Sequence, residues 1–149
     1  MLLDALLQLS NAQAVTATAV STNTIDLSQS RDIGPGENLH VVIAVDTAAT
    51  AAGAATVTFQ IISSAAANLS SPTVLAQTDA IPKTDLLVGR KPIVIDLSPA
   101  VLLAQPIGQR YLGIQYTVGT GPLTAGAFTA YLSNSEGVSA NYPSGFTVF

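Results

Sequence analysis

The stretch RYLGIQYTV, residues 110–118, alternates apolar and polar side chains at every second position. A period of two is that of a β-strand, because successive side chains point to opposite faces of the sheet. One face of this strand would hold Leu112, Ile114, Tyr116 and Val118. We therefore predict a strand here that is buried on one side only.

The same alternation recurs in stretches on both sides of this one. The clearest are residues 38–46, 56–62, 93–97 and 127–133, with shorter ones at 23–27 and 73–78. Glycine and proline punctuate them, as at Gly34-Pro35-Gly36, Ala52-Gly53 and Gly119-Thr120-Gly121-Pro122. About eight short strands with regular turns predict an all-β fold, an antiparallel β-sandwich or jelly roll.

Two stretches have helical features, and the ends differ in composition from the middle. Residues 2–9 fit either a short amphipathic helix or a β-arm, and residues 98–105 (SPAVLLAQ) fit a single helical turn. We expect an N-terminal arm at 1–22, a sandwich core at 23–133 and a C-terminal tail at 134–149.

Composition excludes several classes of function. The 149 residues include no Cys, one His, five Lys or Arg and nine Asp or Glu, for a net charge of −4. We therefore expect no disulfide, cofactor or metal, no basic patch for nucleic acid, and no membrane span. A secretory signal is not expected, because Asp4 interrupts the apolar N-terminus and no basic residue precedes Arg31. The chain is suited to packing and backbone pairing, so we predict that it is not an enzyme.

Residues of catalytic type occur singly in the sequence, which favours structural roles for them. His40 is the single imidazole and lacks a G-x-S-x-G serine elbow, so we interpret it as a structural or surface residue. Carboxylates at Asp26/Asp32, Asp79/Asp85 and Asp96 are candidates for glycoside cleavage, although capping or solvated roles are ordinary for such positions. The loop at 119–126 lacks the lysine of a phosphate-binding loop, and we interpret it as a hairpin loop.

Large apolar side chains at both ends are the candidate contact residues. The predicted interface residues are Leu3, Leu6, Leu7 and Leu9 at one end and Tyr142, Phe146 and Phe149 at the other. Aromatic side chains in a tail need somewhere to be buried, either on their own domain or on a partner. Deleting residues 1–9 or 134–149 is expected to weaken attachment to a partner and leave the core folded.

Four segments carry a family resemblance. They are NAQAVTATAVSTNTIDL (11–27), RDIGPGE (31–37), AATAAGAATVTFQI (48–61) and YLGIQYTVGTGPLTAGAFTA (111–130). Together they resemble the capsid cement, or decoration, proteins of tailed bacteriophages of the Bordetella-phage type. The resemblance implies a jelly-roll-like protein on the outer surface of an icosahedral virion, made in the host cytoplasm. It also implies dimers or trimers that clamp neighbouring major capsid proteins of the HK97-like fold, without catalytic residues.

Two other functions remain as alternatives. A lectin-like jelly roll could recognise host-surface glycans, with Tyr111 and Tyr131 sharing the face opposite the core. A hydrolase using paired carboxylates is the third hypothesis, and its candidates are the aspartates named above.

Overall fold

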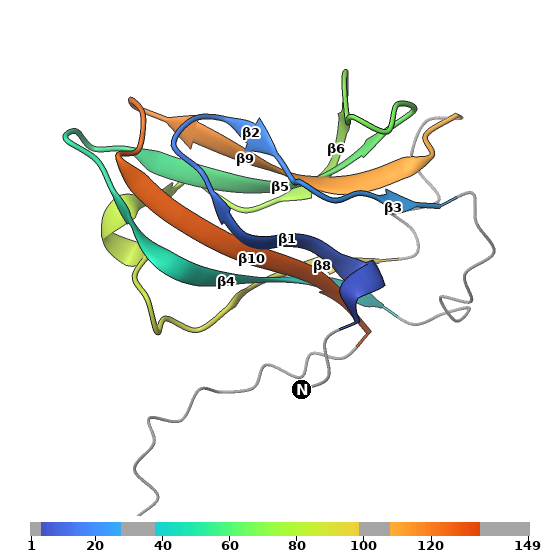
Figure 1. Ribbon diagram of the computed structural model, residues 1–149, viewed down its shortest axis with the longest axis horizontal. Helices are drawn as coiled ribbons and strands as arrows, with labels where there is room; N and C mark the ends of the chain where they lie inside the picture. Colours follow the sequence, from blue (N-terminus) through green and yellow to red (C-terminus); the bar gives the residue numbers. More distant parts are fainter. Residues whose placement is uncertain (1–3, 28–37, 99–107, 135–149) are drawn as a thin grey trace, which may run out of the picture.

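Two antiparallel β-sheets pack face to face in the computed structural model, which describes residues 4–27, 38–98 and 108–134 (Figure 1). The first sheet has the order β1 (Gln8–Ala14), β10 (Ala125–Ser133), β4 (Leu39–Thr50) and β8 (Ile93–Leu97). The second has the order β2 (Ala19–Val20), β9 (Tyr111–Gly119), β5 (Thr56–Ser64) and β6 (Thr73–Gln77). Two short strands extend it, β3 (Ile25–Asp26) beside β9 and β7 (Ile81–Pro82) beside β5. Two 3₁₀ turns complete the structure, η1 (Ala5–Leu7) and η2 (Lys83–Asp85).

The connectivity is that of a jelly roll. Both β2 and β3 pair with β9, and both β6 and β7 pair with β5, so ten strands occupy eight positions. Pairing runs inward from the ends of the chain: β1 with β10, β2 and β3 with β9, β4 with β8, and β5 with β6 and β7. A long hairpin rolled into two sheets has this pattern. The predicted all-β jelly roll of about eight strands is confirmed.

The loop at 119–126 was predicted to be a hairpin loop, and the structure corrects this. It joins β9 of one sheet to β10 of the other, so it crosses between the sheets. Thr120 and Gly121 both adopt positive φ there, at 60° and 100°. Glycine and proline mark a reversal of the chain, but they carry no information about which sheet the next strand joins.

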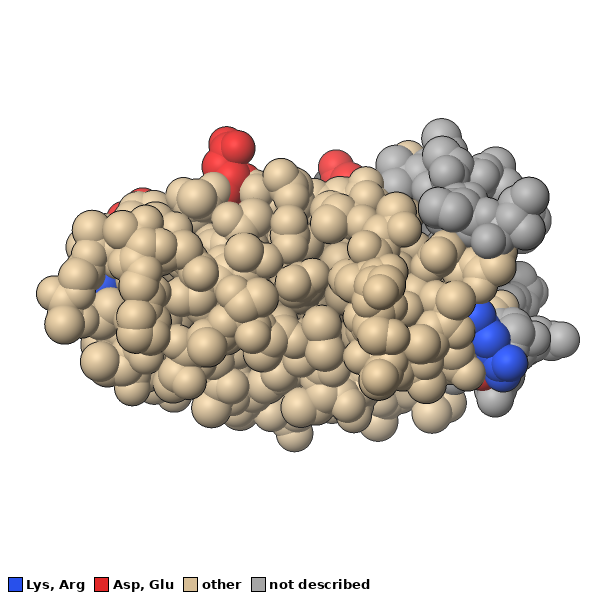
Figure 2. Space-filling model, turned by 90° about the horizontal axis from the view of Figure 1, so that it is seen from above, with Lys and Arg blue, Asp and Glu red and all other residues tan. Residues whose placement is uncertain are grey.

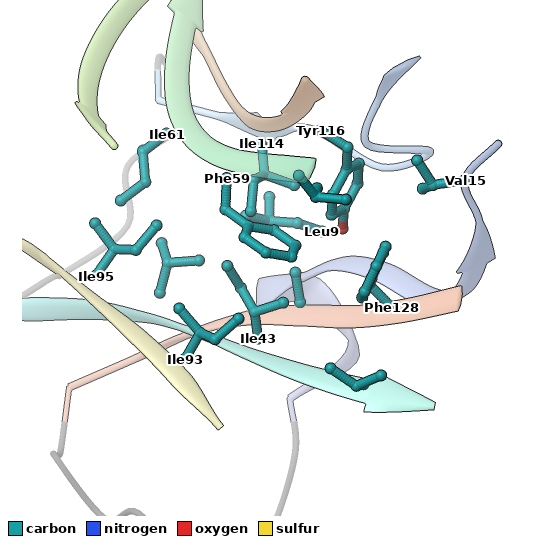
Figure 3. Packing of buried hydrophobic residues seen from close by; sticks show 14 of the residues in the cluster. Leu9, Val15, Ile43, Phe59, Ile61, Ile93, Ile95, Ile114, Tyr116 and Phe128 are labelled. Carbon is teal, nitrogen blue, oxygen red and sulfur yellow. The ribbon is translucent and has the colours of Figure 1, made fainter. Parts of the chain in front are cut away.

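The core between the sheets is built around three aromatic rings (Figure 3). Phe59 meets Tyr116 and Phe128 edge-on at centroid distances of 5.8 and 5.2 Å. Tyr116 and Phe128 lie nearly parallel, 5.6 Å apart. Edge-to-face and offset pairs of this kind add stability beyond the area that they bury. The three rings come from β5, β9 and β10, so they join the two sheets.

The N-terminal region is part of the sandwich from residue 8 onward, which moves the predicted boundary of the 1–22 arm. β1 pairs with the central strand β10 from Gln8↔Tyr131 to Ala14↔Ala127, and Leu9 is fully buried. The helix-or-strand alternative for residues 2–9 resolves into η1 followed by β1, for the part that is described. Most of the helical turn predicted at 98–105, and the tail from residue 135, lie outside the described residues.

Candidate functional site

A chain of hydroxyl and amide groups fastens β1 to the core. The Tyr116 hydroxyl donates to Ser10 Oγ (2.8 Å), and Ser10 donates to Gln13 Oε1 (2.8 Å). Gln13 Nε2 then donates to the carbonyl of Val20 (2.8 Å), and its Oε1 also accepts the N–H of Thr22 (3.0 Å). Burial raises the pKa of Tyr116 from 10.0 to about 12, so its hydroxyl keeps its proton, and remains a donor, into alkaline solution. We call this chain the tyrosine relay and assign it a structural role.

His40 is buried on the outer side of the first sheet, beside an exposed carboxylate. Its Nδ1 lies 2.7 Å from Asp96 Oδ1, and the two residues are cross-strand neighbours on β4 and β8. Ser133 stands opposite His40 on β10, so a serine, a histidine and an aspartate form one row. An acylating serine also needs N–H donors aimed at an oxyanion, whereas this row is formed by direct cross-strand neighbours within a regular sheet, Ser133 opposite His40 and His40 opposite Asp96. We interpret the row as a cross-strand polar contact that stabilises the sheet.

The candidate aspartates are not brought together. Asp26, on β3 of the second sheet, accepts two hydrogen bonds from Arg110, at 2.9 and 2.8 Å. This hydrogen-bonded ion pair raises the pKa of Arg110. Asp96 lies on the other sheet beside His40, and Asp79 follows β6. Asp85 ends η2, and Asp32 lies outside the described residues. Among the described residues, no group of three or more His, Asp or Glu side chains is placed to hold a metal ion.

The predicted leucine contacts separate into three environments. Leu9 is a core residue, so it is not available to a partner, which corrects the prediction. Leu7 packs against the core and is only partly exposed, whereas Leu6 is 68% exposed. Leu3 and the tail residues Tyr142, Phe146 and Phe149 lie outside the described residues. Of the residues that can be placed, only Leu6 keeps the surface position that a contact requires.

Tyr111 and Tyr131 do not form the shared aromatic platform on which the lectin-like alternative depends. Tyr111 lies on β9 of the second sheet, with the guanidinium of Arg110 5.2 Å from its ring centroid. Tyr131 lies on β10 of the first sheet and is buried, which raises its pKa. The two rings lie on different sheets because the 119–126 loop connects β9 in the second sheet to β10 in the first.

The outward side of the second sheet is a broad surface of uncharged polar side chains, here called the Thr/Gln face. Its central residues are Thr58 and Gln60 on β5, Gln115 and Thr117 on β9, and Gln77 on β6. Thr117 Oγ1 donates to Gln60 Oε1 (2.7 Å), and Gln60 Nε2 donates to Gln77 Oε1 (2.7 Å), so three strands are linked. Figure 2, seen from this side, shows charged side chains only toward the margins of the surface.

Sequence reasoning identified the alternation that places these polar residues opposite the core, but not their role. Threonine and glutamine opposite an apolar face are typical of a solvated sheet surface. The face is distinguished by adjacent strands that both carry uncharged polar side chains on the same side. The sequence does not show which strands are adjacent, whereas the register places Thr58 beside Thr117 and Gln60 beside Gln115.

Fold and surfaces together define a jelly-roll domain whose most distinctive exposed feature is an uncharged sheet face. The chain belongs to the Bbp16 family, whose model matches residues 9–132. That range runs from the first strand of the jelly roll into the last one. No curated protein matches the chain. In the described part of the chain, no helix has the length and apolar character needed to cross a membrane.

Proposed function

We propose that this protein is a cement, or decoration, protein on the outer surface of an icosahedral phage capsid. It would bridge neighbouring major capsid subunits of the HK97-like fold and stabilise the shell against the internal pressure of packed DNA. The family match at residues 9–132 contains all four segments on which the resemblance to phage cement proteins rests. The jelly roll supplies the rigid body that such a role requires.

The observation that carries the proposal is the Thr/Gln face. Covering an ionised side chain with another protein costs solvation energy unless the charge is paired, and the middle of this face requires no such pairing. Threonine hydroxyls and glutamine amides both donate and accept, so they can bond to backbone groups of many partners. The bonds among Thr117, Gln60 and Gln77 order these side chains beforehand, which lowers the entropy lost on association.

Cementing strength would come from several contacts made at once. Once one surface of the protein has bound a shell subunit, a second contact forms at high effective concentration. Individually weak contacts then resist separation of the subunits. Leu6 and the two chain ends remain proposed as additional contacts.

Mass spectrometry of purified virions tests the function directly. We expect the protein in molar amounts comparable with the shell protein, because a symmetric shell repeats each contact. Its absence from intact particles would refute the proposal. The role of the Thr/Gln face is tested separately with Gln115→Lys, which adds a charge to that face, and with Asn11→Lys on β1 of the other sheet as the matched control. Only the first is expected to weaken binding to undecorated shells.

The glycan-binding alternative loses its motivating feature, since Tyr111 and Tyr131 lie on different sheets. We therefore do not propose it.

A further inference from the structure

One turn of the chain exposes two large apolar side chains on a firmly anchored backbone. Leu86 is fully buried, and its carbonyl accepts the N–H of Ala49 on β4 (2.9 Å). The next two residues, Leu87 and Val88, are 53% and 63% exposed. Gly89 has a φ of +84°, a conformation that glycine adopts without steric cost, and the chain reverses there. The backbone therefore buries one leucine and turns the following two side chains outward.

Further hydrogen bonds fix the shape of this turn. The backbone N–H of Lys83 donates to the carbonyl of Ala55 (3.0 Å), and its ammonium group donates to the carbonyl of Ala51. Arg90 Nη1 donates to the carbonyl of Asp85 (2.7 Å), which closes the turn from the other side. A surface held in this way loses little entropy on binding, so its apolar area is available for affinity.

The same turn concentrates the positive charge of the protein. Residues 83–91 contain three of the five basic residues, Lys83, Arg90 and Lys91, and one carboxylate, Asp85. This segment has a net charge of +2, whereas the whole chain has a net charge of −4. The residues outside the segment therefore carry a net charge of −6. The turn lies near the Thr50 end of β4, whereas the opposite end of that strand carries His40 beside Asp96 (Figure 1). We call residues 83–91 the basic turn.

We propose that the basic turn is a docking site for an acidic protein surface, with Leu87 and Val88 entering an apolar depression that is rimmed by carboxylates. Arg90 and Lys91 follow the two apolar residues along the chain, and the exposed Lys91 in particular would face that rim. Charge complementarity selects the partner, because opposite potentials guide the encounter and disfavour basic surfaces. This inference rests on the proposed function and assigns the acidic surface to the major shell subunit.

A second copy of this chain also carries a net negative charge, but the symmetry of such a contact argues against that occupant. The basic turn of one copy would bind a different surface of the next, which is a head-to-tail contact. Contacts of that kind close into rings only at particular angles and otherwise grow into filaments. A shell subunit imposes no such growth, so it is the occupant to which the proposal commits.

Binding of the full chain to shells that lack it, measured by co-sedimentation, tests the proposal. We expect the double variant Leu87→Ser/Val88→Ser to bind about tenfold more weakly, because truncating exposed apolar anchors has effects of this size. The matched control Leu87→Ile/Val88→Ile keeps the apolar surface and should bind nearly as the parent does. Lys91→Glu should weaken binding and flatten its dependence on salt, whereas Lys91→Arg should not. All three substituted side chains, Leu87, Val88 and Lys91, are exposed, so melting temperatures should stay unchanged.

Three other outcomes would overturn the proposal in different ways. If the parent protein binds shells and both Leu87→Ser/Val88→Ser and Lys91→Glu bind equally well, the basic turn is not the docking site, while the proposed function stands. If the parent protein does not bind shells at all, the proposed function fails, and the assigned partner fails with it. If the parent protein forms filaments without shells and the serine variant does not, the occupant is a second copy.

Discussion

Replacing Ser10 with alanine tests how much the tyrosine relay stabilises the fold. The substitution leaves the buried Tyr116 hydroxyl without its acceptor, and Gln13 Oε1 keeps only one of its two donors. A buried polar group that loses its partner costs about 1–3 kcal/mol, and we expect Ser10→Ala to lower the free energy of unfolding by about 2 kcal/mol. For a chain of this length that corresponds to a fall in melting temperature of about 4–8 °C.

Ser63 provides a matched control. Like Ser10 it is fully buried, but its Oγ has no hydrogen-bond partner in the described part of the chain. Ser63→Ala removes the same atom without breaking a bond, so the free energy of unfolding should stay within about 0.5 kcal/mol or rise. Urea denaturation followed by circular dichroism measures both variants. Equal losses of stability for Ser10→Ala and Ser63→Ala would refute the structural role of the relay.

Tyr116→Phe completes a double-mutant cycle. Ser10 still donates to Gln13 in this variant, so we expect a smaller loss of about 1 kcal/mol. The double variant Ser10→Ala/Tyr116→Phe removes both partners of the 2.8 Å bond and should lose less stability than the two single losses added together. Strict additivity would mean that the two hydroxyls do not interact in solution.

Alkaline pH offers a second measurement on the same residue. Burial raises the pKa of Tyr116 from 10.0 to about 12, so the folded state holds this proton more tightly than the unfolded state does. The stabilisation is therefore complete below pH 10, and it declines as the pH rises toward 12, by at most about 2–3 kcal/mol. Tyr116→Phe should reduce this alkaline loss, and the raised pKa of Tyr131 leaves a remainder. An identical pH profile for the variant would contradict the assignment.

Three further substitutions test other contacts of the sandwich. Phe59→Ala removes the ring that meets two other aromatic rings and should cost about 3–5 kcal/mol in chemical denaturation. Gly113→Ala would place a Cβ in collision with the buried Leu69 side chain, so a loss of about 1–3 kcal/mol is expected, and adding Leu69→Ala should recover part of it. Arg110→Ala breaks the exposed pair with Asp26 and should cost less than about 1 kcal/mol, and less still at high salt.

The long strands could be predicted from the sequence because their alternation is strong. The boundaries of β8 agree with the prediction at 93–97, where Ile93, Ile95 and Leu97 all point inward. β1 was missed for a physical reason. It contains a single large apolar residue, Leu9, and its register with β10 shifts twice, with Ala12 at a positive φ of 44°. Its buried Ser10 accepts a hydrogen bond from Tyr116, which is more than a hundred residues away in the chain, so no local pattern indicates this contact.

The candidate surfaces were harder to predict, because residue type indicates polarity and not position. The two tyrosines, Tyr111 and Tyr131, have the same alternation relative to their own strands, yet the loop between them changes sheets. Leu86 and Leu87 are chemically identical neighbours, but one is fully buried and the other is 53% exposed. That difference is set by the backbone bond between Leu86 and Ala49, a contact that no local pattern encodes.

The order of the strands also governs how synthesis can proceed. The last strand, β10, occupies an interior place between β1 and β4, so the first sheet stays split into separate edges until residue 133 has been added. Non-local closure of this kind is slow, and unpaired edges invite association between nascent chains. A premature stop before β10 should therefore yield insoluble fragments rather than a smaller stable domain. Ribosome pausing within residues 111–133 should therefore lower the yield of folded protein more than pausing elsewhere.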